Sequence, residues 1–131
     1  MKLRPMLQVR DVSASSQWYQ RVVGLRSGHG GDEFEMLFSG EEFVLQLHRL
    51  DAHEHGALST PEEGAAGAGV SLWFECDDKA AFDAQVAQAR AAGVTLAEEP
   101  NWSPLAHHYE AALIDPDGYV VMLCSPFQPD A

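Results

Sequence analysis

Two stretches of the chain, LFSGEEFVLQLH at residues 37–48 and LIDPDGYVVMLC at residues 113–124, align without a gap. Apolar residues coincide along both stretches, in the pairs Leu37/Leu113, Phe43/Tyr119 and Leu47/Leu123. Each stretch predicts two strands joined by a turn, since Gly, Asp and Pro favour reversals between runs of strand-forming residues. The alignment also places Gln46 over Met122. The match indicates a duplicated structural module.

The segments around these stretches repeat in the same order. LQVRD at residues 7–11 aligns with FECDD at residues 74–78, and each precedes a helical pattern. Ser13 is the predicted cap of the first helix, and Gly24 its stop. The elements expected in the first half are a strand at 3–10, a helix at 13–23 and strands at 25–29, 33–39 and 42–49. Those of the second half are a strand at 69–76, a helix at 77–93 and strands at 94–100, 107–114 and 119–124. Each half is therefore predicted to be βαβββ.

The length of the chain favours one domain, because 131 residues fall within the range of about 100 to 200 that single domains occupy. We expect an α+β domain over residues 1–131, with module one at about 1–50 and module two at about 69–126. Residues 51–68 form the connector, which is polar, rich in Gly and Ala and without periodicity. A loop of this length is typical of a lid or a mobile crossover.

The net charge of the chain limits the classes of molecule that we expect to bind it. A formal charge of −12 repels phosphate backbones and anionic lipids, so we expect neither nucleic acid nor a membrane as a partner and favour cationic small molecules. The N-terminal residues lack the apolar stretch of a signal peptide, which predicts a cytoplasmic protein. Cys76 and Cys124 lie in apolar strand patterns without metal-type spacing and are interpreted as reduced core residues.

Three sequence segments together resemble the vicinal oxygen chelate superfamily, which includes glyoxalase I, bleomycin-resistance proteins and extradiol dioxygenases. They are VRDVSASSQWYQRVVGL at residues 9–25, FECDD at 74–78 before a helix ending in AAGV, and DPDGYVVML at 115–123. The resemblance covers nearly the whole chain. It implies two tandem βαβββ modules that form a curled mixed sheet around a cavity, and a homodimer that completes the fold.

The resemblance also implies four metal-ligand positions, one on the first and one on the last strand of each module. These positions hold Arg4, Gln46, Ser71 and Met122 in this chain. Divalent ions such as Zn²⁺ prefer imidazole, carboxylate or thiolate ligands, and among these four only Gln46 offers a plausible oxygen. We therefore predict no metal and no other cofactor, with Met122 as an apolar wall of the binding site.

Strand alternation separates an aliphatic face from a mixed one. The aliphatic face, with Leu7, Val9, Leu45, Leu47, Leu72, Phe74, Val121 and Leu123, is predicted to pack against the helices. The mixed face suits a flat, partly polar ligand, because it combines a Trp ring with carboxylates and amides. The candidate ligand-binding residues are Gln8, Gln46, His48, Trp73, Glu75, Trp102, His108, Glu110 and Met122. Trp102 is placed in a loop between two prolines, as a lid or as a packed anchor.

The leading hypothesis is a metal-independent protein of the bleomycin-resistance type, which sequesters a planar compound, preferably a cation, in an acidic aromatic cleft. One alternative is an enzyme of the same superfamily with a shifted metal set, Gln46, His48, His108 and Glu110. Another is a metal-free enzyme, of the isomerase type, with Glu75 or Glu110 as general base. His53 and His55 in the connector predict adventitious metal binding or none. The sequence has no nucleophile elbow, phosphate loop or dinucleotide fingerprint.

Overall fold

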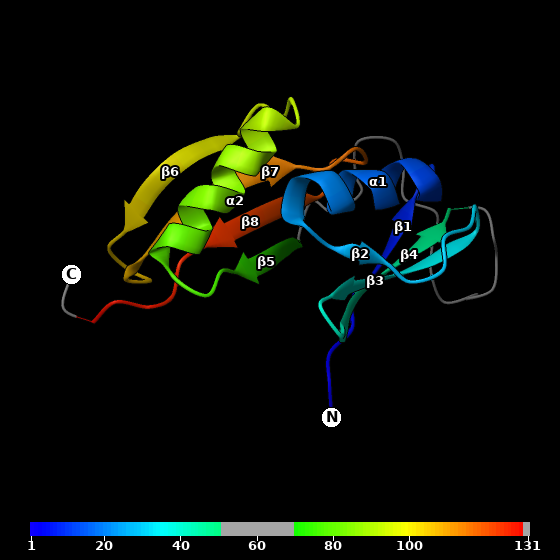
Figure 1. Cartoon of the computed structure of the whole chain (residues 1–131), viewed down its shortest axis with the longest axis horizontal. Helices are drawn as coiled ribbons and strands as arrows, with labels where there is room; N and C mark the ends of the chain where they lie inside the picture. The colour runs from blue at the N-terminus through cyan, green and yellow to red at the C-terminus, as the bar shows by residue number, and fades with distance from the viewer. Residues whose placement is uncertain (51–69, 130–131) are drawn as a thin grey trace. The chain divides into compact units, whose positions relative to one another are not determined.

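Each half of the chain forms a four-stranded sheet with one helix on it (Figure 1). The computed structural model describes residues 1–50 and 70–129, and the chain divides into two compact units, Met1–Ala66 and Gly67–Ala131. The connector, with His53 and His55, lies outside the described residues.

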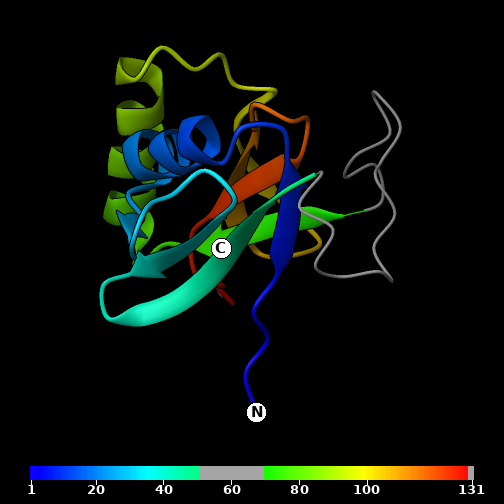
Figure 2. The same cartoon turned by 90° about the vertical axis from the view of Figure 1, so that its right-hand side faces the viewer.

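The first unit has the predicted order. Its elements are β1 (Met6–Val9), α1 (Val12–Val23), β2 (Arg26–Ser27), β3 (Phe34–Ser39) and β4 (Glu42–Arg49). The strand order in the sheet is β1-β4-β3-β2, in which β1 and β4 are parallel and the other pairs antiparallel. Figure 2 shows α1 on one face of this sheet.

The second unit repeats this topology. Its elements are β5 (Ser71–Glu75), α2 (Lys79–Ala91), β6 (Glu98–Ser103), β7 (His108–Ile114) and β8 (Val120–Cys124). The strand order is β5-β8-β7-β6, again with one parallel pair, β5 and β8. The prediction of two βαβββ modules of the α+β class is confirmed.

The strand registers confirm the repeat residue by residue. In the first parallel pair Met6 is opposite Gln46, and in the second Trp73 is opposite Met122. These are the positions that the sequence alignment made equivalent. A one-residue slip in either strand would have exchanged the two faces of the sheet, so the equal registers also keep the same positions on the same face.

The helix caps repeat as well. The side chain of Asp11 accepts a hydrogen bond from the N–H of Ala14, and Asp78 accepts one from Ala81. The prediction that Ser13 caps α1 is wrong, because Ser13 already lies inside the helix and the extended Asp11 precedes it. Gly24 ends α1 as predicted, in the left-handed conformation with φ 75°, which Gly adopts without steric cost.

The aliphatic face of each sheet forms the core beneath its helix. In the first unit Val9, Leu37 and Leu47 are fully buried, and Tyr19 and Val22 of α1 cover them. In the second unit Leu113, Val121 and Leu123 are fully buried, and Phe82 of α2 covers them. Leu72 is also buried, while Phe74 is half-buried. Burying a side chain of this size contributes about 1.5 to 3 kcal/mol.

Strand β6 differs from its prediction. The sequence placed a strand at 94–100, whereas the observed strand is Glu98–Ser103 and contains Pro100. The register shifts between Glu98 and Asn101, as expected for a bulge in an edge strand, where a proline N–H is not needed. The shift brings Trp102 into the strand rather than into a loop. No helix among residues 1–50 and 70–129 is long and apolar enough to cross a membrane.

Candidate functional site

The face of the second sheet away from α2 carries most of the predicted site. Cross-strand pairs set two rows across β5, β8 and β7. One row is Trp73, Met122 and Ala112, and the other is Glu75, Cys124 and Glu110, with His108 two residues before Glu110 on β7. We call the surface formed by Trp73, Glu75, His108, Glu110, Met122 and Cys124 the Trp73 face.

Trp73 is the most exposed aromatic side chain of this face. It is 51 % exposed, whereas its strand neighbour Met122 is 7 % exposed. The indole Nε1–H donates to the hydroxyl of Ser71 at 3.0 Å, which restricts the rotation of the ring. The His108 ring lies beside it, with 6.0 Å between centroids and 38° between planes. The result is an oriented aromatic surface with an apolar base.

His108 and Glu110 form a hydrogen-bonded pair. Nε2 of His108 lies 2.8 Å from Oε2 of Glu110, and the two side chains are 13 % and 19 % exposed. In the neutral imidazole the hydrogen therefore belongs on Nε2, since the carboxylate can only accept. The prediction that the two residues share one face of the strand agrees with this contact. The pair combines a base with a group that orients it, an arrangement used in general acid–base catalysis.

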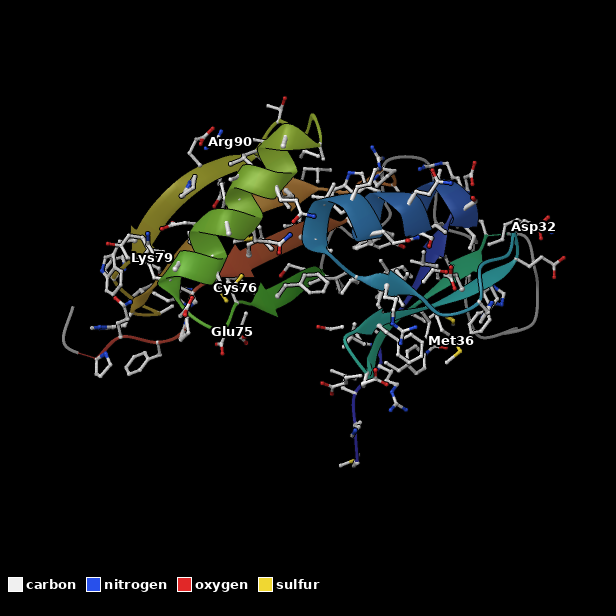
Figure 3. The ribbon with its side chains drawn as sticks, in the orientation of Figure 1. Asp32, Met36, Glu75, Cys76, Lys79 and Arg90 are labelled. Atoms are coloured by element: carbon white, nitrogen blue, oxygen red, sulfur yellow. The ribbon has the colours of Figure 1, made fainter. Side chains whose placement is uncertain are left out.

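Cys124 lies between the carboxylates of this face. Burial and the nearby charges of Glu75 and Glu110 raise the pKa of its thiol to about 11. Glu75 points away from α2 at the end of β5, whereas Cys76 lies on the helix side (Figure 3). At neutral pH Cys124 is a protonated thiol, and a thiol of this kind is a poor nucleophile.

Three other predicted residues, Gln8, Gln46 and His48, lie on the first sheet. On its open face the rows are Gln8, His48 and Phe34, and Met6, Gln46 and Met36. His48 is 4 % exposed, and its ring lies 6.2 Å from that of Phe34. Met36 projects from β3 in Figure 3. The predicted site residues thus form two groups, one on each sheet, and the cavity that the resemblance implies stays a prediction.

The four family metal positions do not suit a divalent ion. The guanidinium of Arg4 lies over the Phe43 ring, with Cζ 4.8 Å from the centroid, and its Nε donates to the Phe43 carbonyl. The amide nitrogen of Gln46 donates to the Arg4 carbonyl at 3.3 Å. The Ser71 hydroxyl already accepts from Trp73, and Met122 offers a thioether. A cation, an amide, a hydroxyl and a thioether lack the anionic or imidazole donors that these ions prefer.

The shifted metal set stays a prediction, because Gln46 and His48 lie in the first unit and His108 and Glu110 in the second. Among the described residues no group of three or more His, Cys, Asp or Glu side chains could hold a metal ion. His108 and Glu110, which that hypothesis needs as ligands, hydrogen-bond to each other.

Trp102 lies on the other side of the second sheet from Trp73. It is opposite Tyr109 in the register of β6 and β7, and its ring packs edge-on against Tyr109 and His107 at 5.2 and 5.9 Å between centroids. The ammonium of Lys79, the first residue of α2, lies 4.7 Å from the Tyr109 ring centroid. These contacts place Trp102 among packed rings on the helix-covered face, while its predicted role in ligand binding stays a prediction.

Glu35 is a charged residue that the sequence reasoning missed. It is 1 % exposed and lies on the helix-covered face of the first sheet. One carboxylate oxygen accepts from the N–H groups of His29, Gly30 and Met36, and the other from the hydroxyls of Ser16 and Ser27. Its alternation with Leu37 in FEMLFS could have placed it on that face, but not its donors.

Comparison with known proteins gives one consistent result. The model of the Glyoxalase/Bleomycin resistance protein/Dioxygenase superfamily matches residues 3–123. A glyoxalase/bleomycin resistance protein/dioxygenase family enzyme from Burkholderia phytofirmans PsJN is 27 % identical, with a TM-score of 0.72 over 95 % of this chain and 98 % of that one. A search among curated proteins finds no match.

Two further solved structures share the fold at lower identity. A lactoylglutathione lyase from Agrobacterium tumefaciens is 21 % identical, with a TM-score of 0.70 over 95 % of this chain and 92 % of that one. A glyoxalase/bleomycin resistance protein/dioxygenase from Nocardioides is 17 % identical, with a TM-score of 0.78 over 98 % and 85 %. With the family match over nearly the whole chain and the repeated βαβββ topology, the protein belongs to the Glyoxalase/Bleomycin resistance protein/Dioxygenase superfamily.

Proposed function

We propose that this protein binds and sequesters a planar small molecule, preferably a cation, without a metal ion. The observation that carries the proposal is the Trp73 face. Trp73 offers a half-exposed, oriented ring, and Glu75 and Glu110 lie on the strands at either side of β8. An aromatic surface attracts flat rings by stacking and cations through its quadrupole. Carboxylates beside it favour the positive charge.

Metal independence is supported by the four family ligand positions. A guanidinium at Arg4 repels a divalent ion, and neither the Ser71 hydroxyl nor the Met122 thioether replaces the missing anionic ligands. A protein that binds a toxic compound in this way would protect a cell by lowering the free concentration of that compound, as a protein of the bleomycin-resistance type would. The homodimer that the family resemblance implies belongs to the same proposal.

The proposal is tested by titrating the protein with a panel of planar aromatic drugs while Trp fluorescence is recorded. Stacking on Trp73 quenches its emission, so the Trp73→Ala variant should lose the response. Trp102→Phe is the matched control, because Trp102 lies on the opposite side of the same sheet; this variant should keep the response. A panel that leaves the wild-type emission unchanged contradicts the proposal.

A second candidate function is proton transfer on a bound substrate. The contact of 2.8 Å between His108 and Glu110 favours it. The sequence suggested Glu75 or Glu110 as the base; we propose instead that Glu110 positions the imidazole of His108, which accepts the proton. Turnover should follow pH and be lost in His108→Gln, with a smaller loss in Glu110→Gln. Turnover that survives His108→Gln excludes this candidate.

A further inference from the structure

The groups around the Trp73 ring differ in which of them are still able to form hydrogen bonds. The indole N–H of Trp73 is used by Ser71, and the Nε2–H of His108 by Glu110. A ligand over the ring therefore meets neither of these donors. The hydroxyl proton of Ser71 remains as a donor near the ring, because that hydroxyl only accepts from Trp73.

The remaining acceptors are more numerous. Nδ1 of His108 forms no hydrogen bond within residues 1–50 and 70–129, and the His108 side chain is 13 % exposed. Glu75 is exposed, and neither of its carboxylate oxygens forms a hydrogen bond within the part of the chain that the structure describes. Glu110 keeps a second oxygen beyond the one that faces His108. A neutral imidazole whose hydrogen is on Nε2 presents a lone pair on Nδ1.

The amide of Asn101 on β6 contributes no donor either. Its nitrogen donates to the carbonyl of Glu99 at 2.9 Å and to that of Glu110 at 3.3 Å. Both of its hydrogens are therefore used on the backbone at the edge of the sheet. The Cys124 thiol between the carboxylates is 4 % exposed, so it does not compete for a ligand.

We propose that the Trp73 face selects planar molecules that carry N–H donors at the ring edge, such as aromatic amines and amidines, and that His108 Nδ1 is the specificity-determining acceptor. The inference rests on the proposed function and names the ligand class for the same face. A positive charge alone does not make a good ligand for this face. A planar cation without N–H groups leaves the lone pair of His108 Nδ1 desolvated and unpaired. Leaving a buried acceptor unpaired costs affinity, whereas pairing it does not.

Two probes of equal charge and similar shape distinguish the contribution of an N–H donor to affinity from that of the positive charge. Proflavine is a planar cation with two ring-edge amino groups, and 10-methylacridinium is a planar cation without N–H groups. At pH 8 we expect the wild-type protein to bind proflavine about five- to tenfold more tightly than 10-methylacridinium, the effect of one hydrogen bond. Fluorescence titration and calorimetry both measure this ratio.

The His108→Phe variant keeps a flat ring beside Trp73 and removes the acceptor. We expect it to bind both probes equally, through a loss of affinity for proflavine. Tyr109→Phe is the matched control on the same strand, because Tyr109 faces the helix side of the sheet; it should keep the wild-type ratio. Circular dichroism of each variant establishes that it is folded.

The outcomes separate the two proposals. If the wild type binds both probes with equal affinity, or if His108→Phe keeps the preference for proflavine, the role of His108 is refuted while planar binding stands. If neither probe nor any member of the drug panel binds, the proposed function fails, and the inference fails with it.

Discussion

Replacing Glu35 tests whether a buried carboxylate holds the first unit together. The side chain joins α1, β2 and the turn between β2 and β3, because its five donors come from Ser16, Ser27, His29, Gly30 and Met36. The Glu35→Ala variant leaves all five donors without their partner. Removing one side of a buried, charge-assisted network costs about 3 to 5 kcal/mol.

The Glu35→Gln variant keeps the shape and removes the charge. The amide oxygen can still accept from the backbone N–H groups of His29 and Gly30, while the amide nitrogen can donate to the hydroxyl oxygens of Ser16 and Ser27 if these rotate. Hydrogen bonds to a charged group are roughly twice as strong as neutral ones, so we expect a loss of about 1 to 2 kcal/mol. Glu35→Gln should therefore lie between the wild type and Glu35→Ala.

The pH dependence of stability gives an independent test. Burial alone would raise the pKa of Glu35, but hydrogen bonds from Ser27, His29, Gly30 and Ser16 outweigh it and lower the pKa below the ordinary 4.5. A lowered pKa in the folded state means that the stabilisation is complete above the unfolded value. It is lost as the pH falls through the folded value. The difference in the free energy of unfolding between wild type and Glu35→Gln should therefore become smaller as the pH falls below 4.5.

The assay is denaturant unfolding followed by circular dichroism, from pH 7 down to pH 3, with melting temperatures as a second readout. For a chain of this size 1 kcal/mol shifts the melting temperature by roughly 3 to 5 °C, so Glu35→Ala should lower it by about 9 to 25 °C. Glu33→Ala is the matched control. Glu33 lies in the same turn and forms an exposed ion pair with Arg49 at 3.3 Å, of the kind that contributes about 0 to 1 kcal/mol.

Two results would refute the reasoning. The first is a Glu35→Ala variant that is as stable as the Glu33→Ala variant. This would mean that water replaces the carboxylate without cost. The second is a difference between wild type and Glu35→Gln that stays constant from pH 7 to pH 3, because the charge of Glu35 would then contribute nothing.

Three further predictions concern the second unit and the whole protein. Asp115→Ala should cost about 1 to 3 kcal/mol, since Oδ1 of Asp115 accepts from the N–H groups of Asp117 and Tyr119 in the turn before β8; a Cm equal to that of the wild type would contradict it. Cys124 should react with iodoacetamide at pH 8 about a hundredfold more slowly than an ordinary thiol, because its pKa is raised to about 11 from 9.0; fast labelling of the native protein, mapped by mass spectrometry, would be the opposite result. Elemental analysis after incubation with Ni²⁺, Zn²⁺, Mn²⁺ or Fe²⁺ and desalting should find less than about 0.1 ion per chain, given the ligands at the four family positions; near one ion per chain would restore a metal-dependent enzyme.

The sequence by itself predicted the topology and most of the face assignments. The gap-free alignment of residues 37–48 with 113–124 predicts the same strand register in both modules, and the structure has it in Met36–Gln46 and Ala112–Met122. This was predictable because side chains alternate along a strand with a local period of two. His108 and Glu110, two residues apart, follow from the same rule.

Only the tertiary structure decided the features that depend on distant residues or on a change of register. The shift between Glu98 and Asn101 moves Trp102 to the helix-covered face, and no alternation pattern reports where a bulge lies. The five donors of Glu35 come from a helix, two strands and a turn. A buried charge is stable only when the folded chain brings such donors to it, so its role is set by the three-dimensional neighbours and not by the adjacent sequence.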